Sequence, residues 1–305
     1  MKKINVAVIG VGKLGREHTR IYAQLPQVNL IGICDKQTSV KKIAAKYHTR
    51  FYEDYLSLLS LSKIDAVSIA VPTHLHYSIT KEVLKKKVNI LLEKPIALTS
   101  EEGSELLDLA QQKNLILQVG HIERFNPVIK KVKAIIDKPL FIECQRLGPY
   151  APRVKDIGVV LDLMIHDLDI ILHLINSEVE SVNASGSKIL SNYEDIAFAC
   201  LKFKNGAMAN LSVSRLSDKK VRKIRIFQSN LYLSLDYLHS TIKKVQKIKG
   251  KIVRRKVKLK NKQEQLETEI ASFIDDTRSK HIFQDYQACE ALKLALIIAK
   301  GANKG

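Results

Sequence analysis

Apolar segments and amphipathic helical segments alternate through the first 120 residues, and this alternation constrains the fold more than any other feature of the sequence. The apolar segments cover residues 4–9, 28–34, 66–71, 89–92 and 115–120. Strands that are apolar along their whole length are buried on both faces, as in a parallel sheet with helices on each side. We therefore predict that this part of the chain is a doubly wound α/β domain.

The pattern changes after about residue 121. Two helical segments, at about 127–136 and 160–174, are followed by a series of strand-like segments, and Asn205-Gly206 between two of them is a strong hairpin signal. Two helical segments end the chain. We predict a Rossmann dinucleotide-binding domain over 1–121 and, over 122–305, an α+β substrate-binding and oligomerisation domain built on a mostly antiparallel, open-faced sheet.

The junction between the first strand and the first helix carries the pattern Gly-x-Gly-x-x-Gly. The first glycine permits the tight turn, the second lets backbone approach a pyrophosphate, and the third lets helix pack on strand. Asp35 ends the next strand, where a carboxylate binds ribose hydroxyls and repels a 2′-phosphate, so we expect NAD rather than NADP, a preference that the neighbouring Lys36 tempers. The expected cofactor contacts here are Gly10, Gly12, Lys13, Leu14, Gly15, Asp35 and Lys36.

Two further segments carry side chains suited to proton transfer. Glu93-Lys94-Pro95 follows an apolar strand, at the end where ligands of open α/β sheets bind, and a lysine there can hold a hydroxyl or act as acid or base. Asp162 and His166 are four residues apart in a predicted helix and Asp169 follows, so carboxylates flank the imidazole. Position alone leaves two alternatives open: a surface lysine before a proline, and a helix with ordinary surface acids and one half-buried histidine.

Metal and disulfide chemistry find little support in the sequence. His74, His76 and His121 lie near the strand ends, but no carboxylate or cysteine completes a set of about three ligands, so we expect no metal. The four cysteines are far apart and form no C-x-x-C, which is typical of a cytoplasmic protein. No apolar run is long enough to span a membrane, and we expect no membrane partner.

The net charge of +19 raises nucleic acid as a partner. Between Lys219 and Lys262, however, the sequence contains sixteen Lys or Arg residues and one acid, Asp236, so this segment supplies most of the excess positive charge. Apolar residues alternate with the lysines there, which favours outer strands with a solvated face, and lysines discourage edge-to-edge aggregation. Because aromatic residues are nearly absent from the segment, we expect no nucleic-acid partner. An anion-attracting surface is the alternative.

Together these segments resemble the Gfo/Idh/MocA oxidoreductases, NAD(P)-dependent enzymes that act mostly on sugars and sugar derivatives. The likeness covers most of the chain, and Pro72-Thr73-His74-Leu75-His76 is similar to the family's T-P-N-x-x-H segment, with Val71 and Thr73 in place of Thr and Asn. The resemblance implies that Lys94 lies at the nicotinamide and substrate, that His166 is the acid/base and that Asp162 helps hold substrate. It adds to the cofactor contacts Val71, Pro72, Thr73, His76, Glu93 and Lys94.

Residues 120–127, 148–153 and 159–169 look like the branch that oxidises UDP-N-acetylglucosamine at the 3-hydroxyl. For such a sugar nucleotide, His166 would remove the hydroxyl proton while Lys94 hydrogen-bonds the same oxygen. The further substrate contacts that we expect are Arg124, Asn126 and Arg153, because arginine forks match phosphate. In similar proteins the open sheet face forms dimers or tetramers, and we expect a homo-oligomer. Alternatives are an enzyme for another sugar, inositol or related small substrate, and a non-catalytic NAD-binding protein.

Overall fold

A computed structural model describes residues 3–60, 63–150, 157–259 and 264–302, which form two compact units. The first unit comprises Met1–Ile122 and Glu264–Cys289, and the second comprises Glu123–Gln263 and Glu290–Gly305. We expected the second domain to run unbroken from 122 to 305. Instead, the segment Glu264–Cys289 packs with the first unit, because its helix completes the core there.

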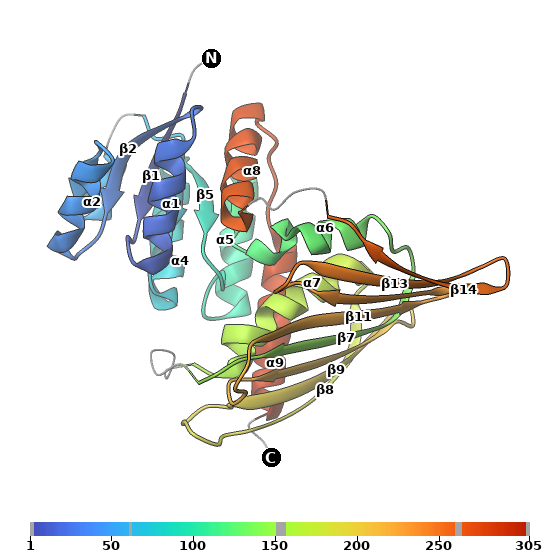
Figure 1. Cartoon of the computed structure of the whole chain (residues 1–305). Helices are drawn as coiled ribbons and strands as arrows, with labels where there is room; N and C mark the ends of the chain where they lie inside the picture. The colour runs from blue at the N-terminus through green and yellow to red at the C-terminus, as the bar shows by residue number, and fades with distance from the viewer. Residues whose placement is uncertain (1–2, 61–62, 151–156, 260–263, 303–305) are drawn as a thin grey trace. The chain divides into compact units, whose positions relative to one another are not determined.

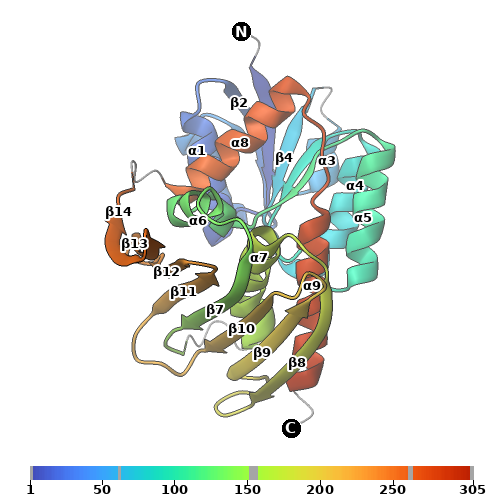
Figure 2. The ribbon, with the colours of Figure 1, turned by 90° about the vertical axis from the view of Figure 1, so that its right-hand side faces the viewer.

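The first unit is built on a six-stranded parallel sheet, sheet A, with strand order β3-β2-β1-β4-β5-β6. Helices α1 and α8 lie on one face of this sheet, and α4 and α5 lie on the other (Figure 2). This confirms the predicted doubly wound domain. The strands are β1 (Ile4–Ile9), β2 (Val28–Cys34), β3 (Arg50–Tyr52), β4 (Ala66–Ile69), β5 (Asn89–Leu92) and β6 (Leu117–Val119); the helices are α1 (Lys13–Gln24), α2 (Lys41–Lys46), α3 (Tyr55–Leu59), α4 (His76–Lys85), α5 (Ser100–Gln112) and α8 (Gln265–Ser279).

Helix α8 belongs to the core of sheet A although it lies about 150 residues further along the chain than the last strand of that sheet. Its apolar face contributes Ile270 and Phe273, both fully buried, to the cluster that also holds Ile21 and Tyr22 of α1. Burying an apolar side chain of this size contributes about 1.5–3 kcal/mol. The first unit therefore needs residues from both ends of the sequence.

The second unit is built on an eight-stranded sheet, sheet B, with strand order β14-β13-β12-β11-β7-β10-β9-β8. Only β7 and β10 pair in parallel among the described strands of this sheet, which confirms the mostly antiparallel prediction. The strands are β7 (Pro139–Leu147), β8 (Val179–Ser187), β9 (Ile196–Phe203), β10 (Met208–Ser214), β11 (Val221–Gln228), β12 (Leu231–Asp236), β13 (Thr241–Ile248) and β14 (Lys251–Val257); the helices are α6 (Pro127–Lys133), α7 (Ile165–Ile175) and the part of α9 (Tyr286–Ala302) from Glu290 onward.

One face of sheet B is covered by helices and the other is open (Figures 1 and 2). Helix α7 packs on β7, and the end of α9 contacts β8, where a Cβ at Gly301 would lie 3.3 Å from that of Ala184. On β9, alternate residues such as Leu201 are buried, whereas Phe198 is 50% exposed on the opposite face. The sheet therefore has the open face that the period-two alternation predicts.

The helix predicted over 160–174 differs from the structure at its start. Residues Val160–Met164 form a π-helical turn, η4, and the regular helix α7 begins at Ile165. Single π-turns widen a helix and are frequent at functional sites. The predicted i, i+4 relation between Asp162 and His166 therefore crosses from the π-turn into the first turn of α7.

Candidate active site

The glycine loop forms the tight turn that the sequence predicts. Gly10 has a φ of +85°, and a Cβ there would meet the Ala70 carbonyl carbon at 2.7 Å. A Cβ at Gly15 would lie 1.9 Å from the Gly10 oxygen, so only glycine permits this contact of helix with strand. Around Gly12, in contrast, a Cβ would meet nothing within 4 Å. This backbone is therefore open to a ligand at the start of helix α1.

The first turn of α1 suits a phosphate. No acid lies in this turn, and Gly12, Lys13 and Leu14 are exposed. The free N–H groups and positive dipole end of a helix attract anions. The residues present therefore fit the diphosphate of a dinucleotide.

Asp35 lies beside this loop. Its carboxylate oxygens accept hydrogen bonds from the backbone N–H of Val11 (2.7 Å) and of Gln37 (2.8 Å). The side chain is half-buried at the end of β2, next to the exposed Lys36. A fixed carboxylate next to the phosphate-binding turn is suited to hydrogen-bonding ribose hydroxyls.

Lys94 is half-buried and follows Glu93, which is held by a buried network in the first unit. The Glu93 carboxylate lies 3.0 Å from Nε2 of His18, whose Nδ1 lies 3.0 Å from the Ser68 hydroxyl. The Tyr22 hydroxyl lies 2.7 Å from the same Ser68 oxygen. A chain of polar contacts thus runs from helix α1 through β4 to Glu93. It holds the backbone at Glu93, next to Lys94, so Glu93 has a positioning role.

His76 is also a supporting residue, since its side chain is 1% exposed. Its Nδ1 lies 2.7 Å from the Pro95 carbonyl and its Nε2 lies 2.9 Å from the Val71 carbonyl. Burial lowers its pKa, which favours a neutral ring that donates to one of these carbonyls at a time. The imidazole ties the segment after β4 to the segment after β5. Val71 and Thr73 are half-buried and Pro72 is exposed, so a ligand can reach this segment.

In the second unit, the π-turn η4 and helix α7 carry Asp162 and His166, both half-buried. The residues that follow along α7 point into the protein: Asp167 is 1% exposed and Asp169 is fully buried. His166 therefore lies on a helix whose following residues, Asp167 and Asp169, are buried in the core. Half-exposure of an imidazole is suited to proton exchange with a bound molecule.

Arg124 is held by Asp169. Its Nε lies 2.8 and 3.0 Å from the two carboxylate oxygens, and Nη2 contacts the same group. Such a forked pair is among the stronger polar contacts in proteins. We expected Arg124 at the substrate, whereas this pair commits most of its guanidinium to anchoring α7.

Asn126 differs from the expectation of a substrate contact, because its side chain is 1% exposed. Its Oδ1 accepts from the N–H of Val128 at 3.0 Å, which makes it the N-cap of α6, and its Nδ2 donates to Glu123 at 3.2 Å. The amide is used within the protein, as the cap of α6 and a donor to Glu123. The third expected contact, Arg153, lies outside the described residues.

A buried charged cluster behind His166 was not predicted. Arg146 donates to both carboxylate oxygens of Asp167, at 2.9 and 3.0 Å, and to the Tyr237 hydroxyl, which in turn donates to Asp167 at 2.9 Å. Glu123 accepts a weaker bond from Arg146 at 3.3 Å. Burial raises the pKa of Tyr237 well above its ordinary value. The alternation of β7 carried a signal, because it places the cation Arg146 on the buried face, where it needs a counter-charge.

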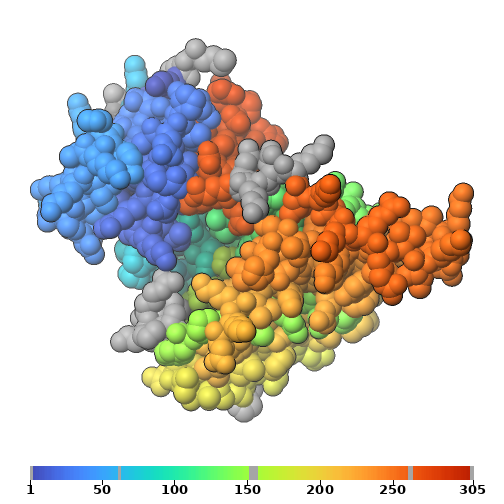
Figure 3. All heavy atoms as spheres, in the orientation of Figure 1, coloured from blue at the N-terminus to red at the C-terminus, as the bar shows by residue number. Residues whose placement is uncertain are grey.

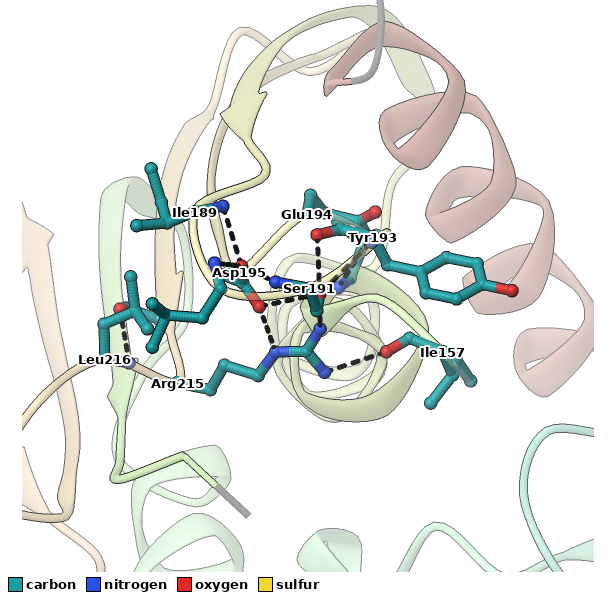
Figure 4. A network of polar contacts seen from close by, with 11 residues as sticks. Ile157, Ile189, Ser191, Tyr193, Glu194, Asp195, Arg215 and Leu216 are labelled. Atoms are coloured by element: carbon teal, nitrogen blue, oxygen red, sulfur yellow. Dashed lines mark hydrogen bonds and ion pairs between the residues drawn. The ribbon is translucent and has the colours of Figure 1, made fainter. Parts of the chain in front are cut away.

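A second buried pair fixes the start of the π-turn (Figure 4). Arg215 donates from Nε to Asp195 at 2.6 Å and from Nη1 to the carbonyl of Ile157 at 2.9 Å. Glu194 accepts from the N–H of Val160 at 3.2 Å, and its carboxylate lies where a Cβ on Gly158 would sit. Residues 157–160, at the start of η4, are thus held by three charged side chains. No residue spacing in the sequence predicts this cluster.

Two classes of site are not found in the described part of the chain. No three His, Cys, Asp or Glu side chains there are grouped so that they could hold a metal ion. Among the described residues, no helix combines the length and the apolar character needed to cross a lipid bilayer.

Two family models match the chain. The model described as "Oxidoreductase family, NAD-binding Rossmann fold" matches residues 4–121, and the "GFO/IDH/MocA C-terminal domain" matches residues 130–233. The first match covers the glycine loop, Asp35 and Lys94, and the second covers Asp162 and His166.

Curated relatives and solved structures agree with these matches. UDP-N-acetylglucosamine 3-dehydrogenase of Acidithiobacillus ferrooxidans is 38% identical over 79% of this chain and 77% of its own length. The scyllo-inositol 2-dehydrogenase (NAD(+)) of Bacillus subtilis is 29% identical over 70% of this chain and 68% of its own. A crystal form of the Acidithiobacillus enzyme superposes with a TM-score of 0.93 at 32% identity, covering 99% of this chain and 98% of that one.

Proposed function

Because the chain belongs to the Gfo/Idh/MocA family of NAD-binding oxidoreductases, we propose that it oxidises the 3-hydroxyl of UDP-N-acetylglucosamine to the 3-keto sugar nucleotide. The observation that carries this proposal is the 38% identity to a UDP-N-acetylglucosamine 3-dehydrogenase over 77% of that enzyme. The half-buried Lys94 and His166 support it, because a protein that only binds the dinucleotide needs neither.

The first unit binds NAD through backbone and one carboxylate. The N–H groups at the start of α1 and the open backbone of Gly12 receive the pyrophosphate, while Asp35 hydrogen-bonds the ribose. A 2′-phosphate would meet the Asp35 carboxylate, which disfavours NADP. A bound NAD⁺ would supply the hydride acceptor for this oxidation.

Two side chains handle the hydroxyl proton. We assign proton removal to the half-buried His166, and hydrogen bonding of the reacting oxygen to Lys94. The lysine charge stabilises the developing alkoxide. Asp162 holds a sugar hydroxyl. Arg124, His76 and Glu93 act by placing these groups, since each is engaged with another protein group.

The experiment incubates the purified protein with NAD⁺ and UDP-N-acetylglucosamine, follows NADH absorbance, and measures the product mass. The expected result is NADH formation with a sugar nucleotide that has lost two hydrogens. A panel of UDP-glucose, myo-inositol and scyllo-inositol tests the second candidate, an inositol or free-sugar dehydrogenase, which the 29% identity to an inositol enzyme favours. Turnover with inositol and none with the sugar nucleotide would replace the first assignment with the second.

We also propose that the protein is a cytoplasmic homodimer or homotetramer joined through the open face of sheet B. That face exposes Phe198, Met208 and Phe227, and the Phe227 ring makes tilted contacts with the rings of Phe141 and Tyr232. Exposed apolar patches of this kind mark interfaces. All four cysteines are free, as in a reducing compartment. Light scattering that gives a monomer mass at all concentrations contradicts the oligomer.

A further inference from the structure

Strands β13 and β14 form an arm with an unusual charge. From Lys243 to Lys258 the chain carries nine Lys or Arg residues and no acid. Among the described residues, none of these nine forms an ion pair, and eight of them are exposed. The space-filling view shows the orange hairpin extending beyond the rest of the second unit (Figure 3). Its charge is therefore available to a partner.

The pairing of the two strands increases this charge density on both faces. Lys243 lies opposite Lys256, and Lys244 lies opposite Arg255. Successive pairs in a ladder point to opposite faces, so each face receives one pair of like charges. Like charges directly opposite each other destabilise a sheet, which means that the hairpin carries this arrangement at a cost to its own stability.

The tip adds an apolar element. Ile248 is 41% exposed and Ile252 is 64% exposed, on either side of a turn at Lys249 and Gly250, both with positive φ. Ile248 lies opposite Lys251, and Ile252 lies opposite Lys247. Lysines alone would suffice to keep an edge strand from aggregating. Two isoleucines at the exposed end of a basic arm need a partner that is both anionic and apolar.

We propose that this hairpin docks on the surface of an anionic phospholipid bilayer. Ile248 and Ile252 belong to successive pairs and point to opposite faces, so the hairpin enters the boundary between headgroups and acyl chains by its tip. The lysines then lie among the lipid phosphates, each attracted by a negative surface. This mode of binding needs no membrane-spanning segment. It therefore revises our expectation of no membrane partner, although no apolar run of the sequence is long enough to span a bilayer. The arm also lies beyond residue 233, where the match to the family's C-terminal domain ends.

Charge and side-chain type favour this partner over two others. A second copy of the arm carries the same nine cations and repels the first. A nucleic acid would take up the charge but not the isoleucines, and between Lys243 and Lys258 the arm has no aromatic residue for stacking on bases. A bilayer with anionic headgroups satisfies both elements at once.

The test is co-sedimentation of the full-length protein with vesicles of phosphatidylcholine, with and without phosphatidylglycerol. We expect binding only to the anionic vesicles, and weaker binding as salt is raised. The variant Lys247→Gln/Lys249→Gln/Lys251→Gln should bind about a hundred-fold more weakly, since each lysine near an anionic surface contributes about five-fold. Ile248→Ser/Ile252→Ser should bind about ten-fold more weakly with the charge unchanged.

A matched control separates position from charge. Lys85→Gln/Lys86→Gln/Lys87→Gln removes three exposed lysines from the end of α4 and should bind vesicles as the unaltered protein does. NADH formation from soluble substrate, or the thermal midpoint if that substrate is not used, shows that each variant is folded. Equal losses in both lysine variants, unchanged binding of the isoleucine variant, or tighter retention on duplex DNA than on anionic vesicles at matched phosphate would overturn the proposal.

Discussion

The glycine loop of the first unit and helix α7 of the second are fixed by different forces. Around the loop, backbone atoms approach so closely that a Cβ at Gly15 would lie 1.9 Å from a carbonyl oxygen, and the Asp35 carboxylate accepts a hydrogen bond from the N–H of Val11. Around α7, in contrast, the anchors are buried ion pairs: Arg146 with Asp167 and Arg124 with Asp169. Further along the chain, Arg215 with Asp195 holds the residues that lead into η4.

This difference decides what a mutation does in each region. A steric cradle tolerates changes of charge but not of volume, because its shape is set by contact. A set of buried pairs tolerates matched replacement of both partners but not the loss of one, since the remaining charge is then buried alone. The predictions below test this contrast, from the largest expected effect to the smallest.

The reacting side chains should give the largest loss. His166→Ala and Lys94→Ala should each lower turnover by about 10²–10⁴-fold, because a positioned acid or base contributes this much. The measurement is kcat for NADH formation, with NAD⁺ binding as the control for folding. Near-normal turnover in both variants rules out the roles assigned to them.

Breaking the Arg146–Asp167 pair should cost about 3–5 kcal/mol of the free energy of unfolding, because Asp167 would be left buried without its cation. Arg146→Met is the single variant, and Arg146→Met/Asp167→Leu should recover part of the loss. Chemical unfolding of both variants gives the comparison. If the double variant is the less stable of the two, the pair is not what holds this part of α7.

Substitutions of Gly15 and Gly12 should affect different properties, protein stability for Gly15 and NAD⁺ binding for Gly12. Gly15→Ala should lower the free energy of unfolding by about 3 kcal/mol, because overpacking forces the backbone apart. Gly12→Ala, where a Cβ has open space, should keep the stability and weaken NAD⁺ binding by about ten-fold. Thermal unfolding and NAD⁺ titration report the two effects. Equal stability of the two variants would show that the close approach at Gly15 is not limiting.

Asp195 should make the free energy of unfolding depend on pH in the acidic range. Burial acts to raise its pKa, but hydrogen bonds from the N–H of Leu190 and from Arg215 outweigh burial, so the pKa is lowered. A carboxyl with a lowered folded pKa adds stability that is complete above its ordinary pKa of about 4 and declines as pH falls below it. Unfolding between about pH 7 and pH 3 should therefore show a smaller decline in Asp195→Asn than in the unaltered protein. Parallel profiles would contradict this.

The N-cap of α6 should give the smallest effect. Asn126→Ala should cost about 1 kcal/mol, and Asn126→Asp, which also caps, should cost less. Neither should change KM for the sugar nucleotide by more than the loss of stability explains, since the side chain is 1% exposed. A large rise in KM with unchanged stability would return Asn126 to the substrate site.

Local pattern predicted most of the fold. The apolar strands of sheet A and the alternation of sheet B are patterns over a few residues, and β1, β2 and β5 have the predicted bounds. The short β3 and α3 were not predicted, because three to five residues carry too little periodicity. The π-turn was not predicted either, since i, i+4 spacing fits a regular helix equally well.

The candidate site divides in the same way. The glycines, Asp35 and Lys94 follow strands directly, so neighbouring residues define their surroundings. The charged pairs join residues that are far apart in the sequence. Arg124 and Asp169 are 45 positions apart, and Arg215 and Asp195 are 20 positions apart. Such pairs form only when strands and helices pack; the alternation of β7 indicates that Arg146 is buried, but no local pattern identifies its partner. Asn126 shows the same limit, because an asparagine before a proline predicts a helix cap as readily as a ligand contact, and in the structure its side chain caps α6.

Helix α8 completes the core of sheet A, but it is translated long after the strands of that sheet. Ile270 and Phe273 fill that core, although they are translated about 150 residues after β6. Domains generally fold as their chain leaves the ribosome, N-terminal first. Here the nucleotide-binding unit must wait with one apolar flank uncovered while all eight strands of sheet B are made. During that interval its uncovered apolar surface makes it prone to aggregation, and a messenger truncated before codon 265 would yield a Rossmann unit with an open core.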